Sequence, residues 1–386
     1  MTGPLVGLRV VEFAGIGPGP FASLMLAELG AEVVRVDRPS AVGTTGGSVL
    51  GRSRPSVALD LKSDRGRAVA LRLVSRADVL LEGNRPGVME RLGLGPERCR
   101  EVNPGLVYGR MTGWGQGGPL AHRAGHDITY AALTGALHAT GGVDKPRNAL
   151  NLVADFGGGA MFLVSGVLAA LYERGRSGQG QVVDAAMVDG ASTLMSMFYG
   201  QHAVGRWEDR REANLLDGGT PYYDTYACAD GRFVAVGALE PQFFAELMRG
   251  TGLDFEQRDQ STWPAMRAAL AAVFLTQTRD EWADVFEGVD ACVAPVLSLS
   301  EAPRHPHLAQ RGTFEPYADG HLPVVAPRFS RTPGLSPGEV RPVGHDSRTV
   351  LTGIGFSDDE IDALISAGIV GEPVTDTVTE RGDVSA

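Results

Sequence analysis

The chain has 386 residues, of which 43% are hydrophobic and 21% charged, a composition typical of a globular protein with room for two domains. Its formal net charge of −11 argues against general binding to nucleic acid or to anionic membranes, because such binding depends on clustered Lys and Arg. The three cysteines are widely spaced, without a C-x-x-C motif or a neighbouring histidine cluster, which favours reduced cysteines over a zinc site. We expect no metal.

The first residues of the chain and the length of its apolar runs indicate where in the cell we expect the protein. No basic segment followed by an apolar one opens the sequence, and no apolar run approaches the about 20 residues that span a bilayer. We therefore expect a cytoplasmic protein that does not contact the membrane. Residues 375–386 are polar, and we expect them to form a disordered tail.

Short β-branched runs alternate with amphipathic stretches along the first part of the chain. They predict strands and helices in this order: strand 9–12, helix 21–29, strand 32–36, strand 57–59, helix 64–76, strand 79–81 and strand 106–110. Strands that alternate with helices indicate a parallel sheet with crossover helices. Further on, a glycine-rich start and an apolar run predict a buried helix over 156–174, ended by Gly175 and Gly178. A strand at 182–185 and a helix at 190–204 follow.

The second part of the chain predicts a smaller α/β unit. Strands at 222–228 and 232–236 flank Ala229, Asp230 and Gly231, which is the pattern of a hairpin. Helices at 241–249, 266–276 and 279–287 and a strand at 291–296 come next. A proline-rich segment at 323–342 then indicates a linker, and helices at 347–351 and 357–367 are expected to return to the first domain.

These elements predict an α/β fold with a large domain, built on a mostly parallel, Rossmann-like sheet, and a smaller α/β domain. The expected division is a large domain that begins with residues 1–220, a small domain at 221–315, a linker at 316–345 and C-terminal helices with the tail at 346–386.

One segment near the start matches part of a dinucleotide-binding fingerprint. Gly15, Gly17 and Gly19 lie between a predicted strand and a predicted helix, and Asp37 follows about 20 residues later. The third glycine of G-x-G-x-x-G would fall on Pro20, and Pro18 removes a backbone N–H that a pyrophosphate would need. The match to the fingerprint therefore fails at Pro18 and Pro20. An NAD-dependent oxidoreductase is kept as an alternative to a rigid loop that lines another nucleotide-like ligand.

Several segments together resemble the class III CoA-transferase (CaiB/BaiF-type) superfamily, and the resemblance covers nearly the whole chain. They are Gly7-Leu-Arg-Val-Val-Glu12, Gly83-Asn-Arg-Pro-Gly87, Thr112-Gly-Trp-Gly115 with Gly118-Pro119, Gly178-Gln-Gly-Gln-Val-Val-Asp184 and Gly355-Phe-Ser-Asp-Asp-Glu-Ile361. The superfamily usually has Glu-Asn-Phe-Arg-Pro-Gly where this chain has Glu82-Gly-Asn-Arg-Pro-Gly87. The resemblance implies an acyl-CoA thioester as substrate, no cofactor beyond the CoA of that substrate, and an interlocked homodimer.

Within the superfamily, Gly125-His-Asp-Ile-Thr-Tyr130 is similar to the signature of the α-methylacyl-CoA racemases, whereas the transferases generally lack the histidine. Asp155 matches the aspartate that the transferases use as a nucleophile and the racemases use as a base. Glu240 matches the carboxylate of the small domain that supports the histidine. The resemblance thus implies His126 and Asp155 as catalytic bases, with Glu240 in support of the histidine. A nearby carboxylate, either Glu240 or Asp127, would fix the tautomer of His126 and keep it basic.

The chemistry suits these residue types. Inversion of a carbon next to a thioester requires one base on each face of the enolate, and histidine side chains titrate near neutral pH. Asp155 would become a stronger base if apolar neighbours raised its pKa. We expect the backbone N–H groups of Asp155 and of Gly157, Gly158 and Gly159 to bind the enolate oxygen. The alternative for these glycines is close helix packing.

Cations near the ends of strands are candidates for binding CoA, since ligands bind there in open α/β sheets. The expected substrate- and CoA-binding residues are Ile16, Arg38, Leu61, Lys62, Asn84, Arg85, Arg91, Gly125 and Tyr130. The leading hypothesis is a racemase that interconverts (2R)- and (2S)-2-methylacyl-CoA. A CoA-transferase that acts through Asp155 is the alternative within the superfamily.

Overall fold

The structure, a computed structural model, describes residues 3–44, 49–336 and 338–373. Their internal contacts divide them into two compact units: the described parts of Met1–Tyr130, Leu150–Leu194 and the chain from Val324 form one, and Ala131–Ala149 with Met195–Pro323 form the other. The expected domain boundaries at residues 220, 315 and 345 stay a prediction. The expected disordered tail at 375–386 lies outside the described residues.

Within the described residues, the first unit contains a seven-stranded sheet in the order β14-β3-β2-β1-β4-β5-β8. All neighbours from β3 to β8 pair in parallel, and β14 pairs antiparallel with β3. The strands are β1 (Arg9–Phe13), β2 (Glu32–Asp37), β3 (Ser56–Leu59), β4 (Val79–Glu82), β5 (Val107–Thr112), β8 (Val182–Ala186) and β14 (Val370–Gly371). The prediction of a mostly parallel sheet is confirmed.

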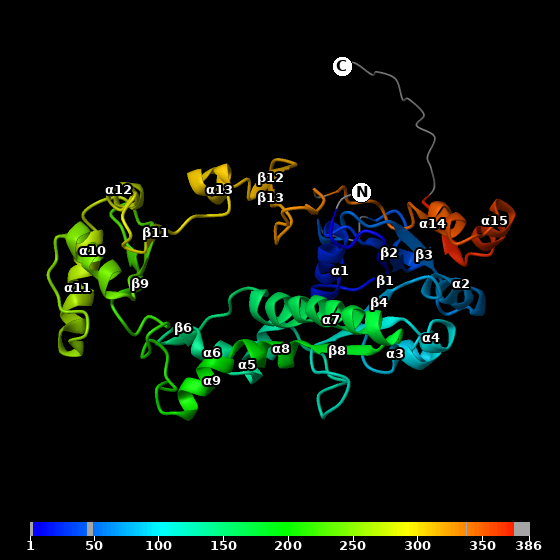
Figure 1. Ribbon diagram of the computed structural model, residues 1–386, viewed down its shortest axis with the longest axis horizontal. Coiled ribbons are helices and arrows are strands. Elements are labelled where there is room, and N and C mark those ends of the chain that lie inside the picture. Colours follow the sequence, from blue (N-terminus) through cyan, green and yellow to red (C-terminus); the bar gives the residue numbers. More distant parts are fainter. Residues whose placement is uncertain (1–2, 45–48, 337, 374–386) are drawn as a thin grey trace, which may run out of the picture. The chain divides into compact units, whose positions relative to one another are not determined.

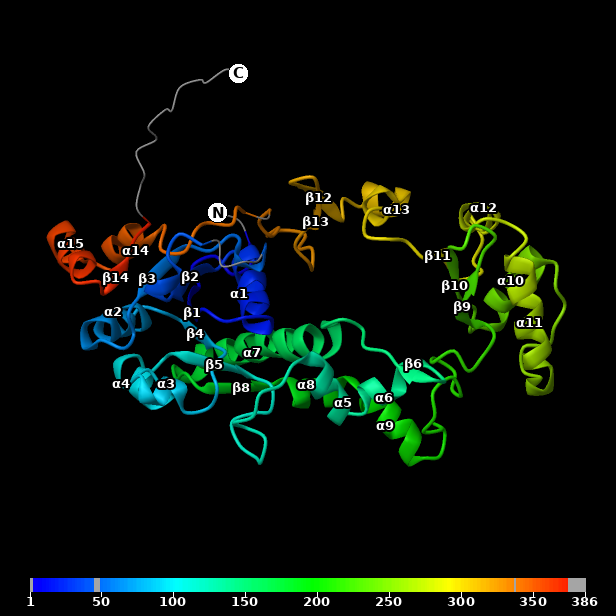
Figure 2. The same cartoon turned by 180° about the vertical axis from the view of Figure 1, so that it is seen from behind.

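Helices cover both faces of this sheet, as its parallel pairing requires. The helices α1 (Pro18–Glu28) and α7 (Met161–Ser177) lie beside the strands (Figure 1). Val10 of β1 packs in the same core as these two helices, whereas Val11, the next residue, belongs to the core on the other face. That face is covered by α2 (Asp64–Val74), α3 (Val88–Arg91), α4 (Pro96–Val102), α14 (Ser347–Gly353) and α15 (Asp358–Ser366). Figure 2 shows α14 and α15 beside β3 and β14, at one edge of the sheet.

Two predicted helices differ from the structure. The first, α1, begins at Pro18, three residues before the predicted start, because proline is well suited to the first turn of a helix. The predicted helix at 190–204 is two helices, α8 (Met187–Leu194) and α9 (Ser196–Ala203).

The long apolar helix also begins earlier than predicted. A π-helix over Leu152–Ala160 leads directly into α7, which passes Gly175 and ends where Gly178 adopts a left-handed conformation with φ 73°. Together the two helices form a 26-residue segment that is long and apolar enough to cross a membrane, so the expectation that no apolar run reaches this length was wrong. Core helices of globular proteins can be as long and as apolar as this segment. The helix α7 packs against β5 and β8 of the sheet.

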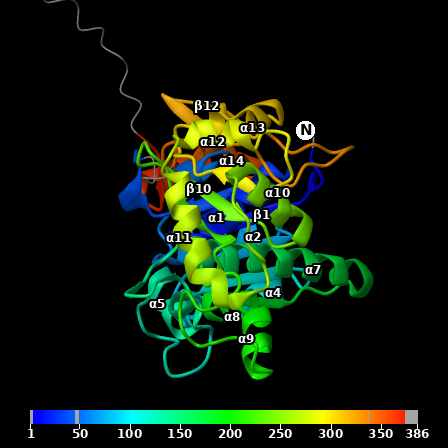
Figure 3. The same ribbon diagram turned by 90° about the vertical axis from the view of Figure 1, so that its left-hand side faces the viewer.

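The second unit contains a three-stranded antiparallel sheet in the order β11-β10-β9. Its strands are β9 (Tyr223–Ala227), β10 (Phe233–Gly237) and β11 (Val293–Pro295), and the predicted hairpin of the first two is confirmed. Figure 3 shows β10 with α10 (Pro241–Thr251), α11 (Trp263–Phe274) and α12 (Arg279–Val285), which bury one shared core with it.

The remaining elements are short, and the hydrophobic periodicity did not predict them. They are α5 (Asp127–Leu133), α6 (Ala136–Ala139), β6 (Gly141–Gly142), β7 (Lys145–Pro146), α13 (Pro306–Gln310), β12 (Phe314–Tyr317), β13 (Gly320–Pro323) and the 3₁₀ turns Pro39–Ala41, Val49–Gly51, Gln260–Thr262 and Ala302–Arg304.

A buried ion pair lies at the end of β1. Arg54 donates to the carboxylate of Glu12, and the two side chains are 0% and 2% exposed. Arg54 also donates to the carbonyl oxygen of Pro20 at 3.1 Å, which ties the segment before β3 to the first turn of α1. Burial raises the pKa of Glu12, while Arg54 and Arg35 act in the opposite direction.

We predict that Arg54→Met lowers the free energy of unfolding by about 3–5 kcal/mol, because it leaves the Glu12 carboxylate buried without its partner. Arg98→Met is the matched control, since Arg98 and Glu101 form a pair with side chains 52% and 62% exposed. Its effect should stay below about 1 kcal/mol. Urea denaturation of both variants measures the difference, and equal losses would contradict a structural role for the Glu12–Arg54 pair.

Candidate active site

A cavity of about 410 Å³ lies in the first unit at the carboxyl ends of the central strands. The strand order reverses between β1 and β4, since β2 and β3 lie on one side of β1 while β4, β5 and β8 lie on the other. Connections that leave in opposite directions open a crevice at such a point. Phe13, Glu82 and Thr112, at the ends of β1, β4 and β5, line the cavity.

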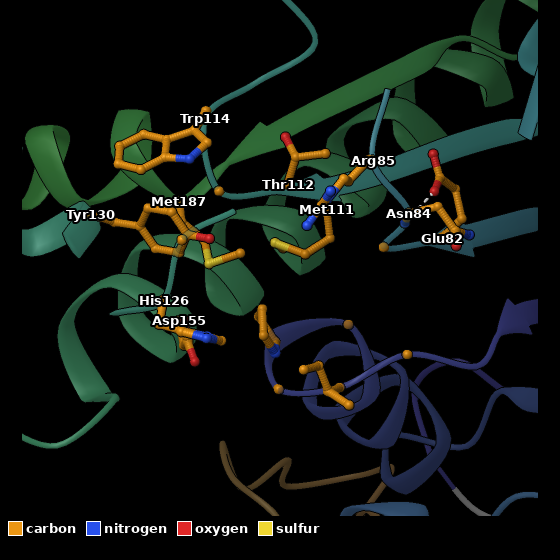
Figure 4. Close-up of a pocket in the computed structure, with 18 of the residues that line it drawn as sticks. Glu82, Asn84, Arg85, Met111, Thr112, Trp114, His126, Tyr130, Asp155 and Met187 are labelled. Carbon is orange, nitrogen blue, oxygen red and sulfur yellow. Dashed lines mark hydrogen bonds between the residues drawn. The ribbon is translucent and has the colours of Figure 1, made fainter. Parts of the chain in front are cut away.

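The two predicted bases lie together in this cavity. His126 and Asp155 both line it, and Figure 4 shows them next to each other at one end. The imidazole is exposed and the carboxylate is half-buried. His126 precedes α5, where its backbone N–H donates to Oγ1 of Thr129 at 2.9 Å and that hydroxyl donates back to the His126 carbonyl at 2.7 Å.

Asp155 lies in the first turn of the π-helix. Burial raises the pKa of its carboxyl group above the ordinary value, and the charge of Asp127 raises it further. The side-chain amide of Asn151, 3.5 Å from Oδ2 of Asp155, and the nearby His126 lower it. The net rise makes Asp155 a stronger base than an exposed aspartate. Gly17 lies so close that a Cβ there would stand 3.4 Å from Oδ2 of Asp155.

The carboxylate of Asp127 binds the start of the same helix. Its Oδ2 accepts hydrogen bonds from the backbone N–H groups of Ala154 and Asp155, both at 2.8 Å. The N–H of Asp155 is therefore already engaged, and its predicted role as a donor to the enolate oxygen was wrong.

The three glycines after Asp155 serve close packing. The π-helix begins at Leu152 and continues through Ala160, so the N–H groups of these glycines lie inside the helix and not at its free first turn, contrary to our prediction. A Cβ on Gly158 would stand 2.5 Å from the backbone nitrogen of Ala191, and one on Gly190 would stand 1.8 Å from the Gly158 carbonyl oxygen. The helix of Asp155 thus crosses α8 at a separation that only glycine permits.

Tyr130 forms one wall of the cavity. Its ring occupies the space where a Cβ on Gly113 or Gly125 would lie, 2.2 and 2.4 Å from ring atoms. The ring also makes an edge contact with Trp114, with centroids 4.7 Å apart. Burial raises the pKa of the Tyr130 hydroxyl, the charge of Asp155 adds to this, and Arg85 opposes it. The hydroxyl is therefore a neutral donor close to Asp155.

The predicted CoA-binding residues fall into two adjoining groups within the first unit. A second cavity of about 900 Å³ is lined by Ile16, Arg38, Leu61, Lys62, Asn84 and Arg91. The first cavity is lined by Arg85, Gly125 and Tyr130, and by Ile16 and Asn84 again. The two cavities share the loop before α1 and the turn after β4, so they can hold neighbouring parts of one ligand.

Sequence reasoning missed the network that holds this turn. Glu82 is buried, and its carboxylate accepts the backbone N–H of Asn84 at 2.7 Å and Nε of Arg110 at 3.1 Å. Arg110 also binds Glu90 on α3 at 2.8 Å, next to Arg91. Glu82 ends a strand and stands two residues before Asn84, a spacing that could have indicated the role. Asn151, four residues before Asp155, was missed because the helix was predicted to start at 156.

Glu240 lies in the second unit. It is exposed and precedes α10. Its predicted support of His126 stays a prediction. Across residues 3–44, 49–336 and 338–373 no group of three or more His, Cys, Asp or Glu side chains could hold a metal ion.

The dinucleotide alternative fits the structure poorly. Asp37, which would bind the ribose, is buried and accepts bonds from Arg35 at 2.7 Å and from the Ser56 hydroxyl at 2.6 Å. Two prolines, Pro18 and Pro20, leave the first turn of α1 with fewer N–H donors for a pyrophosphate.

Comparison with known proteins agrees with the resemblance of the motifs. The family model of CoA-transferase family III matches residues 5–347. The chain belongs to CoA-transferase family III. Members similar to it include the α-methylacyl-CoA racemases of Mus musculus and Homo sapiens, 48% and 44% identical, each over 95% of this chain and 97% of the relative.

Two further proteins are less similar to this chain. The succinyl-CoA–D-citramalate CoA-transferase of Chloroflexus aurantiacus is 29% identical over 95% of this chain and 98% of its own. A crystal structure of a CaiB/BaiF family protein from Brucella suis superimposes with a TM-score of 0.78 at 26% identity, covering 92% of this chain and all of that one.

We predict that Gly158→Ala impairs both folding stability and activity, because its Cβ would press against the Ala191 backbone and move the helix that carries Asp155. The loss of stability should be about 1–3 kcal/mol. Gly175→Ala is the control: nothing lies within 4 Å of its added Cβ, and alanine should stabilise α7 by about 0.5–1 kcal/mol. Thermal unfolding of both variants checks the opposite signs. A stable, fully active Gly158→Ala would show that the crossing tolerates a side chain.

Proposed function

We propose that the protein is an α-methylacyl-CoA racemase that interconverts (2R)- and (2S)-2-methylacyl-CoA. The observation that carries the proposal is the pairing of His126 with Asp155 at one end of a single cavity that adjoins the proposed CoA cavity. The similarity to two racemases along 95% of the chain supports it.

In the proposed reaction, the deprotonated member of the pair, either the Asp155 carboxylate or the neutral His126 imidazole, removes the proton from the α-carbon. The electron pair of that C–H bond moves into the thioester carbonyl and forms an enolate, and the protonated member then returns a proton to the opposite face. Each turnover therefore exchanges the protonation states of His126 and Asp155, and the reverse turnover restores them. The raised pKa of Asp155, due first to burial and then to Asp127, suits a base that abstracts a weakly acidic proton.

Hydrogen-bond donors that are already in place stabilise the enolate oxygen as its charge develops. The neutral hydroxyl of Tyr130 and the guanidinium of Arg85 line the cavity of the two bases and are donors of this kind. No cofactor takes part, since the CoA group belongs to the substrate.

The CoA moiety occupies the second cavity in this proposal. Arg38, Lys62 and Arg91 are exposed at its wall and offer positive charge to the phosphates of CoA. Local charge of this kind is needed because the chain as a whole carries −11.

We also propose an interlocked homodimer in the cytoplasm, in which Glu240 of one chain supports His126 of the partner. The long helix exposes apolar side chains that a partner chain would bury. Leu152, Met161 and Tyr172 are 55%, 42% and 74% exposed in the single chain. The prediction that follows is that a monomeric form separated by sedimentation is inactive.

A CoA-transferase that acts through Asp155 is the second candidate, and the transferases among the similar proteins favour it. In that reaction the carboxylate of Asp155 would attack the thioester, release the CoA thiolate and form a mixed anhydride. Hydroxylamine would then trap the acylated Asp155, whereas a racemase passes through no such acyl-enzyme.

We predict that the enzyme incorporates deuterium from D₂O at the α-carbon of 2-methylacyl-CoA without an acceptor acid or a nicotinamide. His126→Ala and Asp155→Ala should each lower the rate of racemisation at least about 100-fold, because one face of the enolate then lacks its base. Mass spectrometry and chiral analysis of the product measure both effects. Transfer of CoA to a free carboxylate, with label and chirality unchanged, would favour the transferase instead.

We predict that Arg38→Gln raises KM for the acyl-CoA about tenfold while kcat changes little, because Arg38 lines the CoA cavity and not the cavity of the bases. Arg65→Gln, an exposed arginine of α2 that lines neither cavity, should leave KM unchanged. Steady-state kinetics of both variants measure KM and kcat. Equal KM values for the two variants would show that the CoA phosphates bind elsewhere.

A further inference from the structure

One carboxylate lies between the chain segments that carry the two proposed bases. Asp127 follows His126 directly and begins α5, and this residue is 5% exposed. Oδ2 of Asp127 accepts the backbone N–H groups of Ala154 and Asp155, both at 2.8 Å. The side chain of Asp127 thus joins two segments that are 28 residues apart in the sequence.

The bonds are made where the helix itself offers no acceptors. The bond of the Phe156 N–H to the Asn151 carbonyl at 3.2 Å has the i to i−5 span of the π-helix, so the N–H groups before Phe156 lie in its first turn. An ionised carboxylate at a helix N-terminus is stabilised by the helix dipole and makes charge-assisted hydrogen bonds. Because Asp127 is buried, water competes little for these two donors.

The turn on the other side of Asp127 is equally constrained. His126 is held by its reciprocal bonds with Thr129, and its carbonyl also accepts the N–H of Tyr130 at 3.2 Å. The Tyr130 ring fills the space against Gly113 and Gly125. The backbone of His126 therefore has little freedom to move relative to Asp127.

We propose that Asp127 is a positioning residue that sets the separation of the two bases by tying the turn of His126 to the helix of Asp155. The inference rests on the proposed racemase function for its catalytic consequence, although the tie itself is independent of the reaction. A base displaced by about 1 Å loses much of its efficiency, since proton transfer requires close approach to the α-carbon.

Asp127 also acts on Asp155 through its charge. Burial contributes most to the raised pKa of Asp155, and Asp127 contributes next. The other polar or ionisable groups that face Asp155 are His126 and Tyr130 from the α5 segment and Asn151 from the start of its own helix, while the loop before α1 presents Gly17. Loss of the negative charge at position 127 should lower the pKa of Asp155.

Two substitutions separate the effect of the two hydrogen bonds that Asp127 accepts from the effect of its negative charge. In Asp127→Asn the side-chain oxygen can still accept both N–H groups, so kcat should stay within about fivefold of the wild type, while the acid limb of the pH profile of kcat/KM moves to lower pH. In Asp127→Ala both bonds are lost, so kcat should fall about 100-fold while KM for the acyl-CoA changes little. Asp358→Ala, an exposed acid in the first turn of α15, is the control and should behave as the wild type.

Amide hydrogen exchange tests the tie without reference to activity. The peptide that covers residues 151–160 should exchange faster in Asp127→Ala than in the wild type, Asp127→Asn or Asp358→Ala. Unchanged exchange in Asp127→Ala, or a kcat within threefold of the wild type, would overturn the inference. If the wild type instead fails to exchange the α-proton of the substrate, the proposed function is wrong, and the amide exchange still decides whether Asp127 holds the helix.

Discussion

The reversal of strand order between β1 and β4 is the constraint on which the candidate site depends. Because β2 and β4 lie on opposite sides of β1, the chain leaves these strands in opposite directions, and a crevice opens at their carboxyl ends. Both cavities open there, and they share the loop before α1 and the turn after β4. The same edge thus presents the cations proposed to bind CoA beside the pair proposed to move the proton.

Several carboxylates are buried or half-buried near that edge of the sheet. Different partners offset the cost of removing each of them from water. Glu12 is paired with Arg54, and Glu82 is bound by Arg110 and by the backbone of Asn84. Asp127 is bound by two N–H groups at a helix start. The carboxylate of Asp155 lies 3.5 Å from the side-chain amide of Asn151, and burial, followed by the charge of Asp127, raises its pKa. A carboxylate with a raised pKa is suited to accept a proton, which agrees with the proposed role.

Close packing of glycines makes this arrangement possible. The crossing of Gly158 with Gly190 allows the π-helix to approach α8 at backbone contact, and the approach places Asp155 beside the turn of His126. The first turn of the helix then meets Asp127 and Asn151. The geometry of the pair therefore depends on small residues that take no part in the chemistry, as well as on the residues that do.

The sequence by itself determined the parallel sheet, the hairpin of the second unit and the residue types of the site. β-Branched runs bounded by glycine and proline are local signals, and the Gly125–Tyr130 and Asp155 motifs lie within short stretches. Only the tertiary structure decided what Asp127 binds, because its partners are 27 and 28 residues away in sequence. It also decided that the helix begins at Leu152 and that its glycines pack against α8, since a π-helix start and a close crossing depend on contacts with other elements and leave no periodic trace in the sequence.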